Sequence, residues 1–132
     1  MERRYSTVYD LSPETLGRAE FDFVFLGDIL LHTLRPFDAL VAAANVCRGT
    51  LTVAQHMPGA AHDPPAMLYQ GGENPGEDDI CWWLPNEQCF TQLLRKLGFA
   101  EAAGVGTYEG VQRPANQPFS RRIVRARRAG AA

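Results

Sequence analysis

The 132-residue sequence predicts an α/β fold in which parallel strands are flanked by helices. A nearly continuous apolar run over residues 21–28 is typical of a strand covered on both faces of a parallel sheet. An alanine-rich stretch over residues 35–47 repeats apolar side chains at the spacing of one helix face, and Pro36 suits its first turn. Residues 50–55 form a second apolar strand. Short connections join the three segments, which predicts a βαβ unit with a right-handed crossover.

The segments that follow are a loop and a second helix. Arg48 and Gly49 are expected to end the alanine-rich helix. Residues 56–79 are rich in Pro, Gly, Asp and Glu and predict a long loop or lid, directly after the carboxyl end of a strand, where open α/β sheets bind ligands. Helical periodicity returns over residues 85–97, and Gly98 ends that helix.

Strand candidates lie near both ends of the chain. Two are expected over residues 100–111 and 120–127, and a weaker one over residues 5–10. Residues 128–132 are expected to be a disordered tail. The chain as a whole, residues 1–132, is interpreted as a single, partial domain.

Composition excludes several classes of protein. Hydrophobic residues make up 45% and charged residues 21%, close to the average for folded domains, so a disordered or collagen-like chain is excluded. The longest apolar stretch is far shorter than the roughly 20 residues that span a bilayer, and no secretory signal is visible. Three cysteines without a C-x-x-C pair argue against a disulfide framework and favour the reducing cytoplasm.

Charge is distributed unevenly along the chain. The net charge is −2, yet the last twenty residues contain six arginines and no acid. The rest of the chain has seven basic and fifteen acidic residues. We interpret the arginines as a solvated terminal strand and tail, with a nucleic-acid contact as the alternative.

The order and spacing of four segments resemble the second half of a class I S-adenosylmethionine-dependent methyltransferase. In the branch that contains the tRNA wobble-uridine methyltransferases, which the sequence resembles most, an aromatic-aromatic-x-Pro segment precedes the last helix, as in Trp82-Trp83-Leu84-Pro85. The resemblance implies an incomplete Rossmann-like sheet, with strands equivalent to the third to seventh of the family. The matching segments are residues 21–32, 35–36 with the helix after them, 47–51, and 82–86 followed by 93–99.

The first part of the family's fold has no counterpart in the sequence. There is no G-x-G-x-x-G turn, and no strand-helix-strand precedes Tyr5. On this resemblance we expect half a domain: a natural truncation, the product of a misplaced start codon, or one part of a split enzyme. In the family, the strand equivalent to residues 21–28 pairs with the first strand, so its edge would be bare here. We expect a homodimer or a partner chain to cover that edge.

The resemblance implies cofactor contacts at three places. Asp10 and Leu11 would lie beside the adenine of S-adenosylmethionine, although Asp10 also reads as a turn residue ahead of a short helix capped by Ser12. The backbone at Gly27 and Leu31 would line the methionine end of the cofactor. Asp28 would accept from the cofactor's ammonium group, or would instead cap the turn that follows.

Candidate acceptor-side residues follow these positions. His32 is the candidate catalytic base, with a structural histidine as the alternative. Trp82 and Trp83 are candidates for stacking on the substrate, with core packing as the alternative; extended neighbours point to opposite sides, so at most one is expected to face the pocket. Asn86 is a further substrate-binding candidate that can also cap the last helix.

No metal site is predicted. The histidines and acids between His56 and Asp79 match no known ligand spacing. Cys47 and Cys89 are expected to lie on helix faces and are interpreted as small buried apolar residues.

Two hypotheses for the function follow. The first is an S-adenosylmethionine-dependent methyltransferase acting on a small molecule or an RNA nucleoside. The second is a non-catalytic half-domain that requires a partner chain. An RNA-binding module built on the arginine-rich end ranks third, because no RNA-binding motif accompanies those arginines.

Overall fold

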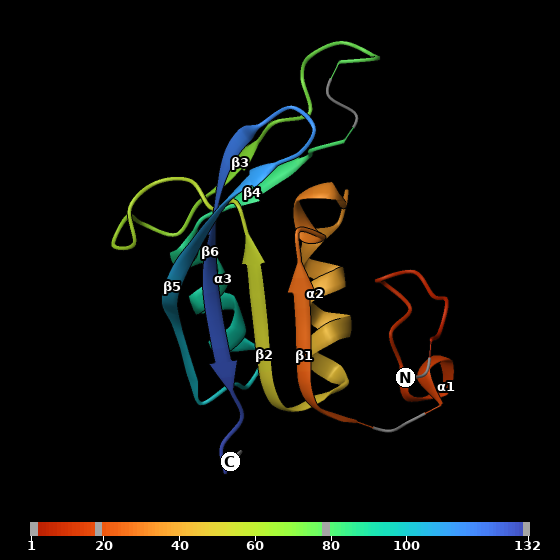
Figure 1. The fold of residues 1–132 in the computed structure, drawn as a ribbon. Coiled ribbons are helices and arrows are strands. Elements are labelled where there is room, and N and C mark those ends of the chain that lie inside the picture. The colour runs from red at the N-terminus through yellow and green to blue at the C-terminus, as the bar shows by residue number, and fades with distance from the viewer. Residues whose placement is uncertain (1–2, 18–19, 78–79, 131–132) are drawn as a thin grey trace.

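The computed structural model describes residues 3–17, 20–77 and 80–130. It has a main sheet, a small second sheet and helices beside the main sheet (Figure 1). The elements are α1 (Pro13–Leu16), β1 (Phe21–Gly27), the 3-10 helix η1 (Leu30–His32), α2 (Pro36–Asn45), β2 (Cys47–Gln55), β3 (Met67–Tyr69), β4 (Trp83–Pro85), α3 (Glu87–Lys96), β5 (Glu101–Gln112) and β6 (Gln117–Arg127).

The main sheet has the strand order β1-β2-β6-β5. The predicted βαβ unit is confirmed: β1 and β2 are parallel neighbours, with Leu26 beside Val53. The sheet is mixed because β6 runs antiparallel to both β2 and β5. A tight hairpin at residues 113–116 connects β5 directly to β6, and directly connected neighbours are necessarily antiparallel.

The hairpin of β5 and β6 reaches past the carboxyl ends of β1 and β2. Strand β6 pairs with β2 only from Arg122 to Arg127, and the last residue of β2, Gln55, lies opposite Arg122. Residues 117–121 of β6 pair with β5 alone. The distal part of the hairpin therefore projects beyond the carboxyl edge of β1 and β2, as Figure 1 shows.

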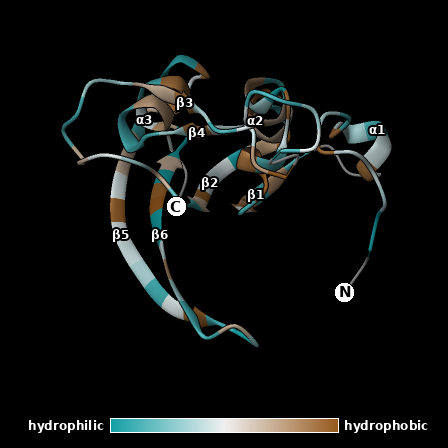
Figure 2. Ribbon diagram, turned by 90° about the horizontal axis from the view of Figure 1, so that it is seen from above, coloured by the Kyte–Doolittle hydropathy of each residue, from teal (hydrophilic) through white to brown (hydrophobic). Residues whose placement is uncertain are grey.

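Helices α2 and α3 pack on one face of the main sheet (Figure 2). The apolar residues of the strands on that face alternate with residues on the opposite face, because side chains along a strand point to alternate sides. Alanines let α2 approach the sheet closely, and Phe90 and Leu94 of α3 are fully buried. The core contributed by the sheet consists of Leu26, Leu51, Val53, Ala102, Val124 and Ala126.

No described helix covers the other face of the main sheet, which we call the open face (Figure 2). Phe23 and Phe25 of β1 lie there with 59% and 55% of their surface exposed. The expectation that residues 21–28 are covered on both faces is therefore wrong for the chain by itself. Strand β1 is also an edge strand of the described sheet. An apolar strand at an edge with one bare face presents a surface for association.

Two further expectations are corrected near the helix ends and the N-terminus. Helix α2 ends at Asn45, and Gly49 lies inside β2, where a Cβ atom would stand 2.1 Å from the carbonyl oxygen of Asp22. That glycine serves a close approach of two backbones rather than a helix stop. Residues 5–10 form no strand in the structure. The expected cap of α1 is present, since the Ser12 hydroxyl accepts from the backbone N–H of Thr15.

The long loop and the tail contain more structure than the sequence predicted. Strand β3 lies within residues 56–79 and pairs antiparallel with β4; residues 78–79 lie outside the described part. Arg128, assigned to a disordered tail, donates to the carbonyl oxygens of Ala44, Cys47 and Leu97 and lies over the ring of Phe99. Residues 131–132 are also outside the described part.

Candidate functional site

The carboxyl edge of β1 carries an unusual backbone conformation. Asp28 follows the strand with a φ of 47°, in the left-handed region that only a few non-glycine residues adopt. Its N–H donates to the carbonyl of Ala54, which holds the turn against the end of β2 at 2.9 Å. A residue kept in this conformation costs free energy, and such positions cluster at functional sites.

Asp28 forms an ion pair with Arg121 of β6. The guanidinium Nε donates to both carboxylate oxygens of Asp28, at 2.6 and 2.8 Å. The side chain of Asp28 is 37% exposed and that of Arg121 is 23% exposed. The guanidinium also lies over the ring of Phe119, 5.0 Å from its centroid, and Nη1 donates to the carbonyl of Ser120. The pair joins the edge of β1 to the projecting hairpin.

His32 is held in a defined orientation beside this edge. Its Nδ1 lies 2.7 Å from the carbonyl oxygen of Ile80. A carbonyl oxygen only accepts, so Nδ1 is the protonated nitrogen and Nε2 of the neutral ring has a free lone pair. The Sγ of Cys81 is 3.9 Å from the same nitrogen. The ring is exposed, as a proton acceptor for a substrate requires.

Trp82 is brought to the same place by the backbone. Its N–H donates to the carbonyl of Leu31 at 2.8 Å, so the segment before β4 runs alongside η1. Trp83 instead stacks edge-on with Tyr69 across the β3–β4 pair, with ring centroids 5.2 Å apart. A Cβ at Gly71 would lie 2.8 Å from the indole of Trp82, so glycine lets that ring close over the backbone. Both tryptophans are half-buried.

Asn86 caps α3 and also ties the preceding loop to it. Its Oδ1 accepts from the N–H of Cys89 and from that of Ala66, and its Nδ2 donates to the carbonyl of Pro64. The expected cap is confirmed. The side chain is buried and most of its hydrogen-bonding capacity is used inside the protein.

Asp10 and Leu11 lie elsewhere. They line a cavity of about 450 Å³ between the N-terminal segment and α2, which includes Arg35 and Asn45 and none of the residues at the carboxyl edge of β1. The Asp10 carboxylate accepts from the hydroxyl of Thr7 at 2.5 Å, as in a turn. The structure therefore does not bring the two proposed ends of the cofactor site into one cavity.

Two polar side chains with buried atoms, Gln55 and Arg122, lie next to each other on the helix-covered face of the sheet at the same edge. Gln55 is fully buried, and neither atom of its side-chain amide has a partner among the described residues. Its neighbour across the strands, Arg122, has a buried Nη1 without a hydrogen bond, although the Glu87 carboxylate lies 4.0 Å away. Buried amides without partners are uncommon and costly.

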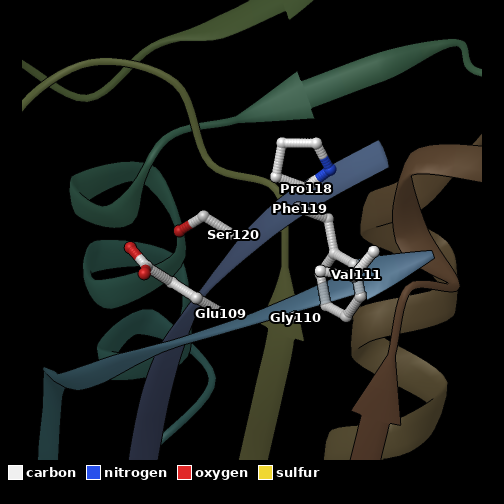
Figure 3. A pocket seen from close by; sticks show the side chains of 6 residues that line it. All are labelled: Glu109, Gly110, Val111, Pro118, Phe119 and Ser120. Carbon is white, nitrogen blue, oxygen red and sulfur yellow. The ribbon is translucent and has the colours of Figure 1, made fainter. Parts of the chain in front are cut away.

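The distal hairpin has a cavity of its own. It measures about 550 Å³, with Phe119 and Val111 together on one side and Glu109 and Ser120 on the other (Figure 3). Gly110 lies opposite Phe119, and a Cβ there would meet the phenyl ring at 2.6 Å. The absence of a side chain at Gly110 therefore lets the ring lie flat across β5.

Neither the Cys47 and Cys89 thiols nor a metal cluster among the described residues marks this site. Cys47, expected on a helix face, is the first residue of β2. Burial raises the pKa of the Cys47 and Cys89 thiols, which favours the unreactive protonated form. Within the described ranges, no three His, Cys, Asp or Glu side chains gather in a way that could hold a metal ion. No helix in those ranges is long and apolar enough to cross a membrane.

Sequence reasoning located part of this arrangement and missed part. Gly27, Asp28, Leu31, His32 and Trp82 lie on adjoining segments at the carboxyl edge. The contribution of β6 was missed because its arginines were interpreted as solvated. The sequence offered no local signal for Arg121, because the alternation of Val124 and Ala126 with Arg125 and Arg127 places arginines on the face away from the core.

Comparison with known proteins identifies the fold. No model of a known protein family matches the sequence, and no curated protein is found to be related to it. Solved structures do match. The N-terminal domain of EvdMO1, crystallised in the presence of SAH and D-fucose, has 20% identity and a TM-score of 0.60 over 96% of this chain and 55% of that chain.

Two further solved structures agree with this match. Magnesium protoporphyrin IX methyltransferase (ChlM) from Synechocystis PCC 6803 with bound SAH has 16% identity and a TM-score of 0.58, over 94% of this chain and 49% of that one. An O-methyltransferase family protein from Burkholderia thailandensis has 13% identity and a TM-score of 0.55, over 99% and 36%.

The chain therefore has part of a methyltransferase fold. It spans about half the length of the EvdMO1 domain and of ChlM. None of the three matching proteins described above is a tRNA wobble-uridine methyltransferase by its description, so the narrower resemblance stays a prediction.

Proposed function

We propose that this chain forms the acceptor side and the methionine end of an S-adenosylmethionine-dependent methyltransferase site. The observation that carries the proposal is the fold match, which extends over 94–96% of the chain to proteins crystallised with SAH. The carboxyl edge of β1 and β2 is where ligands bind in open α/β sheets. Five of the candidate residues lie on adjoining segments there: Gly27, Asp28, Leu31, His32 and Trp82.

The described residues fit one end of the cofactor. The Asp28 carboxylate offers acceptor positions to an ammonium group. Gly27 remains a proposal for the methionine end, although the ring of Phe25 lies 2.6 Å from where a Cβ at that position would stand. Asp10 and Leu11 remain proposals for the adenine, although they line a separate cavity. The sequence has no glycine-rich turn to approach the rest of the cofactor. When bound, S-adenosylmethionine supplies an electrophilic methyl group.

His32 is the proposed proton acceptor of this site. Because Nδ1 is engaged by the carbonyl of Ile80, Nε2 presents its lone pair to a hydroxyl or N–H of the methyl acceptor. Trp82, placed next to Leu31, offers a flat apolar surface to a planar acceptor. Trp83 and Asn86 are weaker candidates, since each already has partners inside the protein. The acceptor is a small molecule or an RNA nucleoside, the latter in line with the wobble-uridine resemblance.

Titration calorimetry with S-adenosylhomocysteine tests the proposal directly. We expect a dissociation constant in the micromolar range for the purified chain. His32→Asn should leave this binding unchanged and lower methyl transfer to an identified acceptor by about 10²-fold or more. A folded chain that does not bind S-adenosylhomocysteine would refute the proposal for the chain by itself.

A second candidate function is a half-domain that requires a partner chain. The exposed Phe23 and Phe25 on the open face favour it, as does the unpaired edge of β1. This chain covers about half of the EvdMO1 domain and about half of ChlM, so the other half of each has no counterpart in it. A partner that pairs with β1 and covers the two rings would complete the sheet.

Oligomeric state and solubility test this second candidate. We expect the chain to self-associate, and the double variant F23T/F25T to shift it towards monomer without loss of secondary structure, because both rings are exposed. The variant Tyr5→Thr removes a still more exposed aromatic ring outside the sheet and serves as the control. A well-behaved monomer with cooperative unfolding would contradict the requirement for a partner.

A further inference from the structure

We propose that Arg121 binds the carboxylate of the cofactor's amino-acid end, while Asp28 binds its ammonium group. The inference deepens the proposed function and depends on it, since the ligand is the methionine end of the same cofactor. It assigns a binding role to a residue of β6, the strand of the main sheet that lies beyond β2 from β1.

The hydrogen-bond inventory of the pair supports this role. A guanidinium has five N–H donors. In Arg121, Nε is used on Asp28, one Nη1 hydrogen is used on the carbonyl of Ser120, and no partner of Nη2 is found in the described part of the chain. A carboxylate accepts about four hydrogen bonds, and from the residues that the structure describes the Asp28 carboxylate receives only those of Nε. The pair therefore has donors left on one member and acceptors left on the other.

The charge pattern matches an amino-acid zwitterion. An ammonium group and a carboxylate on one carbon atom can bind side by side to Asp28 and Arg121 without breaking the ion pair. Each new contact is a charge-assisted hydrogen bond, which is shorter and stronger than a neutral one. A simple cation or anion would match only one half of the site and would meet the opposing charge next to it.

The contribution of the Asp28–Arg121 ion pair to folding stability does not by itself explain why the pair is present. An ion pair with this much solvent exposure contributes little to folding. Asp28 is nevertheless held with a φ of 47°, which aims its carboxylate across the end of β2 towards β6. Phe119 lies against the guanidinium and Ser120 accepts from it, so the orientation of Arg121 is also supported. Supporting contacts of this kind keep a binding group in position.

The test compares two ligands that differ only in the carboxylate. S-adenosylhomocysteine and its decarboxylated analogue, which keeps the amine, are titrated into the wild-type chain and three variants by calorimetry. The wild type is expected to bind S-adenosylhomocysteine at least about 10-fold more tightly than the analogue. Arg121→Gln is expected to reduce that ratio to near one, and Arg121→Lys to keep part of it. Arg125→Gln, an exposed arginine on the same face of β6, is the matched control and should keep the full ratio.

Each outcome is decisive. A ratio that Arg121→Gln leaves unchanged, or equal losses for both ligands, would overturn the assignment while leaving the cofactor site in place. A folded wild-type chain that binds neither ligand would overturn the proposed function, and this inference with it. Far-ultraviolet circular dichroism of each variant checks that it is folded. If Arg121→Gln fails to fold, the ratio measured with Arg121→Lys decides.

Discussion

The side chain of Asn86 offers the sharpest test of how the substrate-side segment is held. In the structure this one amide makes three hydrogen bonds, to the N–H groups of Cys89 and Ala66 at 2.9 and 3.1 Å and to the carbonyl of Pro64 at 2.7 Å. It caps α3 and anchors the part of the long loop that precedes β3 to that helix. Asn86→Ala removes all three contacts and leaves their partners unpaired.

The expected loss of stability follows from these contacts. Removing an N-cap side chain costs about 1 kcal/mol. Each of the two loop contacts is worth about 1 kcal/mol, and more where the partner stays buried. Asn86→Ala should therefore lower the free energy of unfolding by about 3 kcal/mol, and Asn86→Ser by about 2 kcal/mol, because serine keeps the cap and loses the loop.

Urea unfolding followed by circular dichroism measures both variants. With a slope of about 2 kcal/mol per molar urea, the midpoint should fall by about 1.5 M for the alanine variant. Gln92→Ala, an exposed change on the same helix, is the control and should stay within about 0.5 kcal/mol of wild type. A loss below about 1 kcal/mol for Asn86→Ala would refute the view that this residue joins loop and helix, and would strengthen it as a substrate-binding candidate.

Three further predictions concern stability and thiol chemistry. Arg128→Ala should cost about 2–3 kcal/mol in urea unfolding, because the guanidinium donates to three main-chain carbonyls and covers an aromatic ring; an unchanged midpoint would contradict this. Gln55→Met should raise the free energy of unfolding by about 1 kcal/mol, since it removes a buried amide without partners, and a clear loss would show that the amide has an unseen partner. Burial raises the pKa of Cys47 and Cys89, so the folded state holds these thiol protons more tightly than the unfolded state. Their contribution to stability should be present at neutral pH and decline as the pH rises through the thiol range, and both should react with a thiol reagent far more slowly in the native protein than in denaturant; equal rates would refute this.

The elements that the sequence predicted correctly are those with strong local signals. The apolar strand at residues 21–28, the two main helices and the two long C-terminal strands all formed within a few residues of expectation. The errors fell where a local pattern has two explanations. Gly49 was expected to end a helix. It instead allows the backbones of β1 and β2 to approach closely, and the neighbouring residue in β1, Asp22, lies 27 positions away in the sequence.

The candidate site was predicted in part for the same reason. Residues on one strand and the turn after it, such as Asp28 and His32, share a location that chain order alone implies. Arg121 is 93 residues from Asp28, and no local pattern announces the pair. Asn86 was assigned both a cap and a substrate contact, and the cap was confirmed while the substrate contact stays a prediction.

By itself, the sequence determined which segments become the four strands of the main sheet and its two main helices, and that the first two strands run parallel. Those outcomes depend on the period of apolar residues and on short connections, which are local properties. Only the tertiary structure decided that both main helices lie on one face, that Phe23 and Phe25 are left bare on the other, and that the C-terminal hairpin brings an arginine to Asp28. These features depend on which distant segments meet. The sequence does not show whether a phenylalanine in a strand is exposed or buried, because its burial depends on which distant segments pack against it.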